Sequence, residues 1–335
     1  QREISSFALP PNLVKRLIAA GYRYSTDLDK DTRPVELAKE LGCSNQEALS
    51  IIRTVFGTNS SPITSTSAYS LLTKETQLDP IVTFNSAIDE MLGGGVPRGK
   101  LIEFCGVPGV GKTQIGLQLA VDVHIPKSLG GVEGKCIYID TEGSFVPERA
   151  REMAEALIFH LNEISESEDN TIPTIENILQ NIYYYRIHDY IEQIALVHQL
   201  PSILKADSSI KLIILDSVTF HFRHDFENMS QRTRLLNGMA QQLLQLASSQ
   251  NVAVVLINQV TTKVDSFKPS MLVPALGESW GHTVPYRVVL YWDDGIRYAH
   301  LHKSPSHQTS TVPYQITKDG IRDYEILPEK QDPAD

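Results

Sequence analysis

The sequence predicts an α/β protein: a mostly parallel, twisted sheet flanked by helices, preceded by a small all-α N-terminal domain. Three observations lead to this prediction. Residues 106–113, GVPGVGKT, fit the pattern G-x-x-x-x-G-K-T between an apolar run and a helical pattern. Several near-continuous apolar runs end in polar residues, as parallel strands buried on both faces do. Residues 1–57 show only helical periodicity and helix-end signals.

Size and composition set the outer limits. A chain of 335 residues with 41% hydrophobic content has room for one large α/β domain and a small companion. It has no run of 18 apolar residues and no signal-peptide pattern, so we expect neither secretion nor a membrane partner. Cys43, Cys105 and Cys136 form no C-x-x-C pair, which favours a reducing compartment over a disulfide framework or zinc site.

Residues 1–57 predict a small helical domain of the helix-hairpin-helix kind. Gly42 suits the end of one helix, and Ser44 caps the next in an S-x-x-E box closed by Glu47. An earlier helix shows an apolar face made by Leu13, Leu17 and Ile18.

The segment after this domain changes in composition. Residues 57–68 are rich in Ser and Thr with one proline, which is typical of a flexible linker. From about residue 80 strand-like and helical patterns alternate, which indicates a mostly parallel sheet. We therefore expect a helical domain at 1–57, a linker at 58–79 and an α/β core at 80–335.

The glycine-rich stretch at 106–113 predicts a site for ATP or GTP. Its glycines let backbone N–H groups approach phosphate oxygens, and the following helix directs its positive N-terminus at them. Lys112 is expected to reach the β- and γ-phosphates, and the Thr113 hydroxyl to bind Mg²⁺. The expected nucleotide-binding residues are Gly106, Val107, Pro108, Gly109, Val110, Gly111, Lys112, Thr113 and Gln114.

Polar residues follow three other apolar runs, and the carboxyl ends of parallel strands meet at one edge of a sheet. We therefore expect Glu142, Asp216 and Gln259 to converge on Lys112. Asp216 is the candidate to hold Mg²⁺ together with Thr113. Glu142 is the candidate to orient or deprotonate the attacking water, and Gln259 the candidate sensor of the γ-phosphate. Glu142, Lys112 and Gln259 form the predicted catalytic set.

Two irregular segments, 219–234 and 260–281, leave strands whose ends are expected to touch the nucleotide. Long irregular loops are usually functional or disordered. Cations with an aromatic residue nearby suit single-stranded nucleic acid, although solvated loops with a few charges remain the alternative. The candidate DNA-binding residues are Arg223, Arg232, Arg234, Lys263 and Lys268.

The net charge limits how DNA can be bound. The chain carries 30 basic and 40 acidic side chains, a formal charge of −10. Residues 1–57 hold 8 basic and 7 acidic side chains, so the remainder carries −11. Because the overall field opposes a polyanion, any DNA contact must be made locally by loops, and a lone subunit should bind weakly.

Four stretches resemble the RecA-type recombinases in their eukaryotic Rad branch: TFNSAIDEMLGGGVPRGKLIEFCGVPGVGKTQ, YIDTEGSFVPER, LIILDS and INQVTTKVD. The resemblance covers nearly the whole chain, including the helical N-terminal domain. It implies a RecA-like P-loop ATPase core that uses ATP and Mg²⁺ and has two DNA-binding loops, at about 219–232 and 260–281. It also implies a DNA-dependent ATPase of homologous recombination at double-strand breaks and stalled forks, slow alone, in the nucleus with room for a cytoplasmic pool.

The resemblance further implies that ATP lies between neighbouring subunits. Arg149 matches an arginine that packs on adenine, and Gln259 matches the residue that links the γ-phosphate to the second DNA loop. His282 matches a histidine beside the neighbour's nucleotide. Lys303 stands where the recombinases place an aspartate, so it either offsets phosphate charge on a neighbour's nucleotide or is a solvated lysine.

Departures from the family pattern bear on assembly. Filament-forming members carry an aromatic-x-x-Ala motif in the linker, and the matching residues 65–68 read Ser-Thr-Ser-Ala. Since a serine cannot fill an aromatic pocket, self-polymerisation is in doubt. His221, His224 and Asp225 also make the first loop less basic than strand exchange would need.

These departures favour a subunit that joins other proteins. The implied partners are other recombinase paralogues (the B and D paralogues and X-ray cross-complementing members), the main recombinase filament and single-stranded DNA. We expect a recombinase paralogue that promotes or stabilises the main filament. The alternatives are a self-sufficient strand-exchange recombinase and, more distantly, a P-loop small-molecule kinase.

Overall fold

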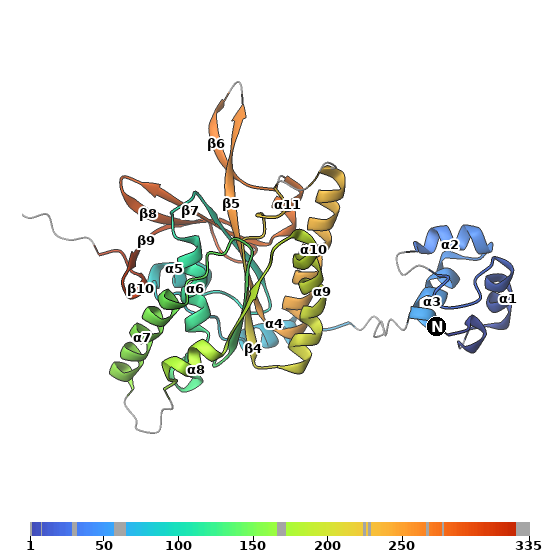
Figure 1. The fold of residues 1–335 in the computed structure, drawn as a ribbon, viewed down its shortest axis with the longest axis horizontal. Coiled ribbons are helices and arrows are strands. Elements are labelled where there is room, and N and C mark those ends of the chain that lie inside the picture. The colour runs from blue at the N-terminus through green and yellow to red at the C-terminus, as the bar shows by residue number, and fades with distance from the viewer. Residues whose placement is uncertain are drawn as a thin grey trace, which may run out of the picture. The chain divides into compact units, whose positions relative to one another are not determined.

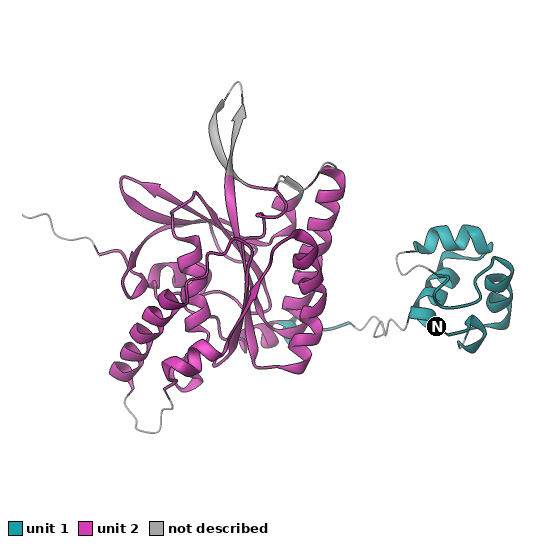
Figure 2. Cartoon of the chain, viewed as in Figure 1, with its two compact units in different colours: residues 1–71 teal, residues 72–335 magenta. Residues whose placement is uncertain are grey.

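The computed structural model describes residues 2–7, 9–28, 32–56, 65–165, 172–223, 226, 229–265, 268–276 and 278–325. The chain divides into two compact units, residues 1–71 and 72–335 (Figure 2). The unit boundary falls inside helix α4 (Ala68–Thr76), in the stretch where the composition predicted a linker. Within the described residues no helix combines the length and apolar character needed to cross a membrane.

The first unit is built from short helices around its own apolar core. Gly42 adopts the left-handed conformation at the end of its helix, with φ of 60°. The backbone N–H of Glu47 donates to Ser44 Oγ at 3.2 Å, and the N–H of Ser44 donates to the Glu47 carboxylate at 2.9 Å, which confirms the predicted capping box. The described helices of this unit before α4 are η1 (Ile4–Ser6), α1 (Pro11–Ala19), α2 (Pro34–Leu41) and α3 (Asn45–Phe56).

The predicted apolar face of α1 is only partly correct. Leu13 and Leu17 are buried, but Ile18 is 45% exposed. The small unit covers one narrow stripe of α1, and residues four apart lie on that stripe whereas a residue 100° further round does not. Ile18 therefore faces solvent in the described unit.

The second unit contains a ten-stranded sheet in the order β10-β9-β8-β7-β1-β5-β4-β2-β3, with β6 paired to β5. The strands from β7 to β3 along this order are parallel, and β8, β9 and β10 add antiparallel strands at one side. The strands are β1 (Leu101–Gly106), β2 (Lys135–Asp140), β3 (Ile182–Arg186), β4 (Ile210–Asp216), β5 (Ala253–Asp265), β6 (Lys268–Pro274), β7 (Tyr286–Asp293), β8 (Ile296–Lys303), β9 (Thr311–Thr317) and β10 (Gly320–Arg322).

Helices cover both faces of this sheet (Figure 1). One face packs against α5 to α8 and the other against α9 and α10, so that each face has its own apolar core. This arrangement confirms the predicted mostly parallel α/β core. The helices are α5 (Ser86–Leu92), α6 (Lys112–Asp122), η2 (Lys127–Leu129), α7 (Pro147–Ile164), α8 (Ile175–Gln180), α9 (Tyr190–Ala206), α10 (Met229–Gln250) and α11 (Glu278–Thr283).

The two segments expected to be irregular are more ordered than predicted. Residues 260–265 continue β5, which pairs antiparallel with β6, and α11 follows. The prediction was wrong because β6 pairs only with β5 among the described strands, and a strand with one free edge tolerates prolines. In the other segment α10 begins at Met229, so Arg232 and Arg234 lie on a helix and not in a loop.

Tyr314 of β9 ties the antiparallel side of the sheet to the phosphate-loop stretch. Its ring is buried, and its hydroxyl donates to the Val110 carbonyl oxygen at 2.7 Å. A buried carbonyl that loses its donor costs about 1 to 3 kcal/mol. Tyr314→Phe should therefore lower the free energy of unfolding by about that amount, measured by urea denaturation.

Tyr298→Phe is the matched control, because Tyr298 is only partly buried and stacks on Tyr291 at 5.7 Å between ring centroids. It should change the free energy of unfolding by less than about 0.5 kcal/mol. Equal losses in the two variants would contradict a stabilising role for the Tyr314 hydroxyl.

Candidate nucleotide-binding site

The stretch between β1 and α6 has the backbone of a phosphate-binding loop. Gly109 and Gly111 have φ of 79° and 108°, in a region that side chains rarely adopt. A Cβ on Gly106 would lie 2.4 Å from the Leu290 carbonyl oxygen, so only glycine fits at the end of β1. The loop leads directly into the N-terminus of α6, which favours bound anions.

The polar strand ends predicted from the sequence meet beside this loop. Glu142 follows β2, Asp216 ends β4 and Gln259 lies in β5, and all three border a cavity of about 340 Å³. The convergence expected from a parallel sheet is therefore present. The cavity is lined by Pro108, Gly109, Gly111, Lys112, Thr113, Gln114, Glu142, Asp216, Ile257 and Gln259.

Thr113 and Asp216 form the part of the cavity suited to a divalent cation. The Thr113 hydroxyl donates to Asp216 Oδ2 at 2.7 Å, and the Tyr138 hydroxyl donates to the same oxygen at 3.0 Å. Burial raises the pKa of Asp216 to about 6, although these hydroxyls act in the opposite direction. A hydroxyl and a buried carboxylate are hard oxygen ligands, so they fit Mg²⁺, whose charge would stabilise the ionised acid. The sequence pattern did not identify Tyr138.

Lys112 lies in the same cavity. Its ammonium donates to the carbonyl oxygens of Gly106 and Val107, both at 2.9 Å. Burial lowers the pKa of Lys112, while the carboxylates of Asp216 and Glu142 act to raise it. The lysine therefore supplies positive charge beside both acids, as its predicted contact with phosphates requires.

Glu142 and Gln259 are joined directly. Glu142 Oε1 accepts from Ser217 Oγ at 2.6 Å and from Gln259 Nε2 at 3.0 Å. The side-chain oxygen of Gln259 in turn accepts from the guanidinium of Arg223, at the start of the first predicted DNA loop. This series of hydrogen bonds connects Glu142, the candidate water-orienting acid, to both predicted DNA loops. Ser217 was missed, and its place directly after Asp216 is the signal that could have identified it.

Arg149 lies at the start of α7 and connects α6 to the turn between β9 and β10. Its Nε donates to Gln114 Oε1 at 2.8 Å, and its Nη2 donates to the Thr317 carbonyl oxygen at 2.6 Å. A third bond joins Nη1 to the Lys318 carbonyl oxygen. Arg149 therefore sits between the phosphate loop and the β9–β10 turn, where a planar cation could cover a base.

The root of the second loop is held by a buried carboxylate that the sequence did not reveal. Glu103 of β1 is fully buried; it accepts from Asn258 Nδ2 at 2.6 Å and from Trp280 Nε1 at 2.7 Å, both through Oε1. Its Oε2 accepts from Arg287 Nε. Asn258 also donates to the Ala275 carbonyl oxygen, so both ends of the β5–β6 hairpin are fixed to β1.

Lys303 and His282 lie together at the end of α11. The Lys303 ammonium donates to the carbonyl oxygens of Gly281, His282 and Val284, at 3.1, 3.2 and 2.8 Å. A cation at this position stabilises the negative end of a helix. Lys303 is therefore not simply solvated in this chain, whereas the imidazole of His282 is exposed.

The remaining candidate DNA contacts separate into groups. Arg223 is exposed, and Arg234 is exposed on α10. Arg232 is partly buried and donates to the Phe222 carbonyl oxygen at 2.6 Å, which gives it a role within the fold. Lys263 and Lys268 lie on β5 and β6, but their side chains are outside the described part of the chain, as are His224 and Asp225. His221 is buried, with Nε2 3.2 Å from the Ile187 carbonyl oxygen.

The fold and the glycine-rich loop define an α/β protein of the P-loop class. Residues 74–324 match the family model described as Rad51, and the chain therefore belongs to the Rad51 family. It is 46% identical to the DNA repair protein RAD51 homolog 3 of Cricetulus griseus over 340 residues, 96% of this chain and 92% of that protein.

Two further relatives extend the comparison. Identity with the DNA repair protein RAD51 homolog 3 of Dictyostelium discoideum is 51% over 248 residues, which cover 72% of this chain and 65% of that protein. Identity with the DNA repair and recombination protein RadA of Aeropyrum pernix is 35% over 319 residues, 94% of each chain. Residues 232–247 and 272–292 resemble, more narrowly, the C paralogue of the Rad fifty-one recombinase, and the two relatives named RAD51 homolog 3 agree with this resemblance.

The buried ion pair between Glu103 and Arg287 can be tested for its contribution to stability. Glu103→Gln would leave Arg287 buried without its countercharge, and breaking such a pair costs about 3 to 5 kcal/mol. We expect a loss of that size in the free energy of unfolding, measured by urea denaturation.

The control is Glu75→Gln, which removes the exposed ion pair with Lys100 at 2.6 Å. Exposed pairs contribute less than about 1 kcal/mol, so this variant should stay close to the unmodified chain. If Glu103→Gln is no more harmful than the control, Arg287 is compensated by another group.

Proposed function

We propose that this chain is a recombinase paralogue that binds ATP with Mg²⁺, hydrolyses it slowly and acts in homologous recombination. Its binding partners are other recombinase paralogues and single-stranded DNA. Its role is to promote or stabilise the main recombinase filament. The single observation that carries the proposal is the direct contact of Glu142 with Gln259, whose amide oxygen accepts from Arg223. This contact joins a candidate hydrolytic acid to the strands that lead into both predicted DNA loops.

The chain's own residues support slow hydrolysis. Thr113 and Asp216 would hold Mg²⁺, which supplies charge to offset the phosphates. Lys112 would bind the phosphate oxygens, and Arg149 would cover the base beside Gln114. Glu142 would accept a hydrogen bond from the attacking water and align it with the phosphate. The Glu142 carboxylate accepts hydrogen bonds from Ser217 and Gln259. Its orientation toward the water therefore depends on the segments after β4 and within β5 that lead into the two predicted DNA loops.

The assembly role rests on the linker and on the relatives. Two relatives carry the name DNA repair protein RAD51 homolog 3, and residues 65–68 have no aromatic side chain to plug into a like subunit. The partners proposed are accordingly other paralogues, the B and D paralogues and the X-ray cross-complementing members. Because the proposed role is at chromosomal DNA breaks and stalled forks, we expect the chain to act in the nucleus, with a cytoplasmic pool as a second location.

The hydrolytic role of Glu142 is tested by Glu142→Gln. This variant should bind ATP and Mg²⁺ within about threefold of the unmodified affinity, because Glu142 does not hold the phosphates. Its turnover should fall about 100-fold or more, as expected when a group that accepts a proton is lost. Phosphate release with single-stranded DNA and fluorescent-nucleotide titration measure the two quantities.

Glu148→Gln serves as the control, because Glu148 is exposed on α7 and pairs only with Arg151 among the ion pairs of the described residues. Its turnover should match that of the unmodified chain. Equal turnover in Glu142→Gln and the control would exclude Glu142 from hydrolysis.

The assembly role is tested by the molar mass of the purified chain with ATP and Mg²⁺, with and without single-stranded DNA. Light scattering should give a monomer or small species, since a serine at residue 65 cannot anchor a neighbouring copy. Long polymers that grow on DNA would instead support a self-sufficient strand-exchange recombinase.

A further inference from the structure

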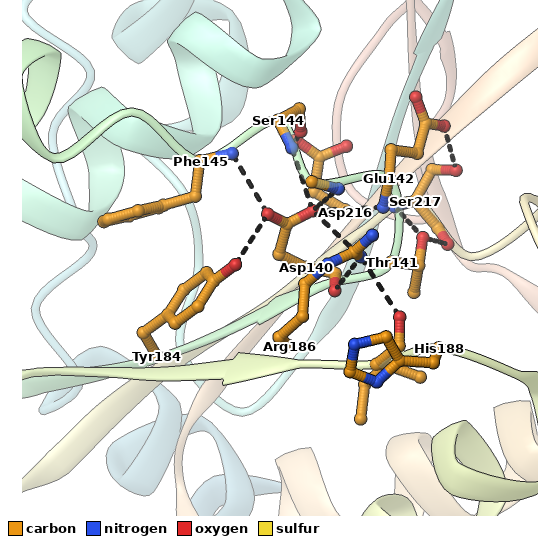
Figure 3. A network of polar contacts seen from close by, with 12 residues as sticks. Asp140, Thr141, Glu142, Ser144, Phe145, Tyr184, Arg186, His188, Asp216 and Ser217 are labelled. Atoms are coloured by element: carbon orange, nitrogen blue, oxygen red, sulfur yellow. Dashed lines mark hydrogen bonds and ion pairs between the residues drawn. The ribbon is translucent and has the colours of Figure 1, made fainter.

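The loop that carries Glu142 folds around a single buried carboxylate. Asp140, the last residue of β2, is fully buried. Its Oδ1 accepts from the backbone N–H groups of Glu142, Gly143 and Ser144 at 3.1, 2.7 and 3.2 Å. Its Oδ2 accepts from the N–H of Phe145 at 3.1 Å, as Figure 3 shows. The direction of the Glu142 backbone is therefore set by where the Asp140 carboxylate points.

Two side chains of β3 fix Asp140 from the other side. The Tyr184 hydroxyl donates to Asp140 Oδ2 at 3.1 Å, and Arg186 Nη1 donates to the Asp140 carbonyl oxygen at 3.0 Å (Figure 3). Among the described strands β3 pairs only with β2, so it forms one edge of the sheet. Tyr184 is 45% exposed there. Tyr184, at the edge of the sheet, is thus connected to the backbone of Glu142 by two hydrogen bonds, both of which are made to the Asp140 carboxylate.

Aromatic packing links the same tyrosine to the second acid of the site. The Tyr184 ring lies 5.1 Å from the Phe145 ring, which lies 4.8 Å from the Tyr138 ring, centroid to centroid. Tyr138 donates to Asp216 Oδ2. The Tyr184 side chain therefore supports the loop through its ring as well as through its hydroxyl, and only the hydroxyl is directed at Asp140.

We propose that Tyr184 is a positioning residue for Glu142, acting through Asp140, and that it sets the rate of hydrolysis without contributing to nucleotide binding. The inference rests on the proposed function in that it names what controls the hydrolytic acid. Without the hydroxyl, Asp140 Oδ2 keeps only the Phe145 N–H among the donors described for that oxygen. The carboxylate is then less constrained in rotation, and the loop N–H groups on Oδ1 lose their fixed acceptor. A displacement of about 1 Å in a reacting group costs up to about 100-fold in rate.

Tyr184→Phe tests this inference, because it keeps the ring and removes the hydroxyl. We expect kcat for ATP to fall about 10-fold, in the range seen when an outer hydrogen-bond partner is removed. KM and the affinity for ATP with Mg²⁺ should stay within about twofold, because neither Lys112 nor Thr113 bonds to Asp140 or Tyr184 and the variant keeps the ring that packs on Phe145. A purely structural defect would lower affinity and turnover together. An unchanged kcat in a chain that hydrolyses ATP would overturn the inference.

Tyr183→Phe is the matched control on the same strand. Successive residues of a strand face opposite sides, and the Tyr183 hydroxyl donates to Asp207 at 3.2 Å, away from Asp140. This variant also loses one hydroxyl bond to a carboxylate, yet it should keep kcat and KM. A fall in kcat equal to that of Tyr184→Phe would assign the effect to the strand and overturn the inference.

Amide hydrogen exchange tests whether Tyr184 positions the loop, and this measurement does not depend on ATP hydrolysis. The amide protons of residues 142–145 should exchange several-fold faster in Tyr184→Phe than in the unmodified chain or in Tyr183→Phe, because their acceptor is less fixed. Unchanged exchange would overturn the inference. If the unmodified chain does not hydrolyse ATP, the ATPase proposal fails, and the exchange rates alone still confirm or overturn the positioning of the loop by Tyr184.

Discussion

Three carboxylates are buried within one parallel sheet, and much of the second unit is arranged to stabilise them. Glu103, Asp140 and Asp216 are each at most 2% exposed, although a buried charge without partners is strongly unfavourable. Each therefore receives several donors: those of Glu103 and Asp216 come from elements distant in sequence, and those of Asp140 come mostly from the loop that follows it. Glu103 takes a guanidinium, an amide and an indole, Asp140 takes four main-chain N–H groups, and Asp216 takes hydroxyls. The need to supply donors to these buried carboxylates therefore constrains the positions of the loops at the carboxyl edge of the sheet.

The three acids also divide the work of the site. Asp216 and Thr113 form the proposed cation site, and Asp140 holds the loop that carries Glu142. Glu103 fixes the base of the β5–β6 hairpin through Asn258, the residue before Gln259. The proposed cation site, the loop that carries Glu142 and the second loop thus rest on different carboxylates, and hydrogen bonds from Gln259 to Glu142 and from Ser144 to Asp216 join the three parts.

The sequence predicted those parts of the site whose residues are close together in the chain. The phosphate loop is continuous, and strand-end residues such as Asp216 and Gln259 follow apolar runs that are easily recognised. The network around Glu103 could not be predicted, because Arg287 lies 184 residues away and neither residue belongs to a local pattern. Likewise, the prolines of β6 suggested an irregular loop, since sequence alone does not show that a strand will lie at an edge.

Lys303 stabilises one end of a short helix inside the subunit. Its ammonium donates to three carbonyl oxygens at the end of α11, the helix that carries His282. Trp280 of the same helix is bonded to Glu103, which is also bonded to Asn258 beside Gln259. The position of His282 is therefore linked through one buried carboxylate to the strand that carries Gln259, the proposed sensor of the nucleotide. In an assembly with ATP between subunits, such a connection would relate the two neighbouring sites without requiring a direct contact of Lys303 with phosphate.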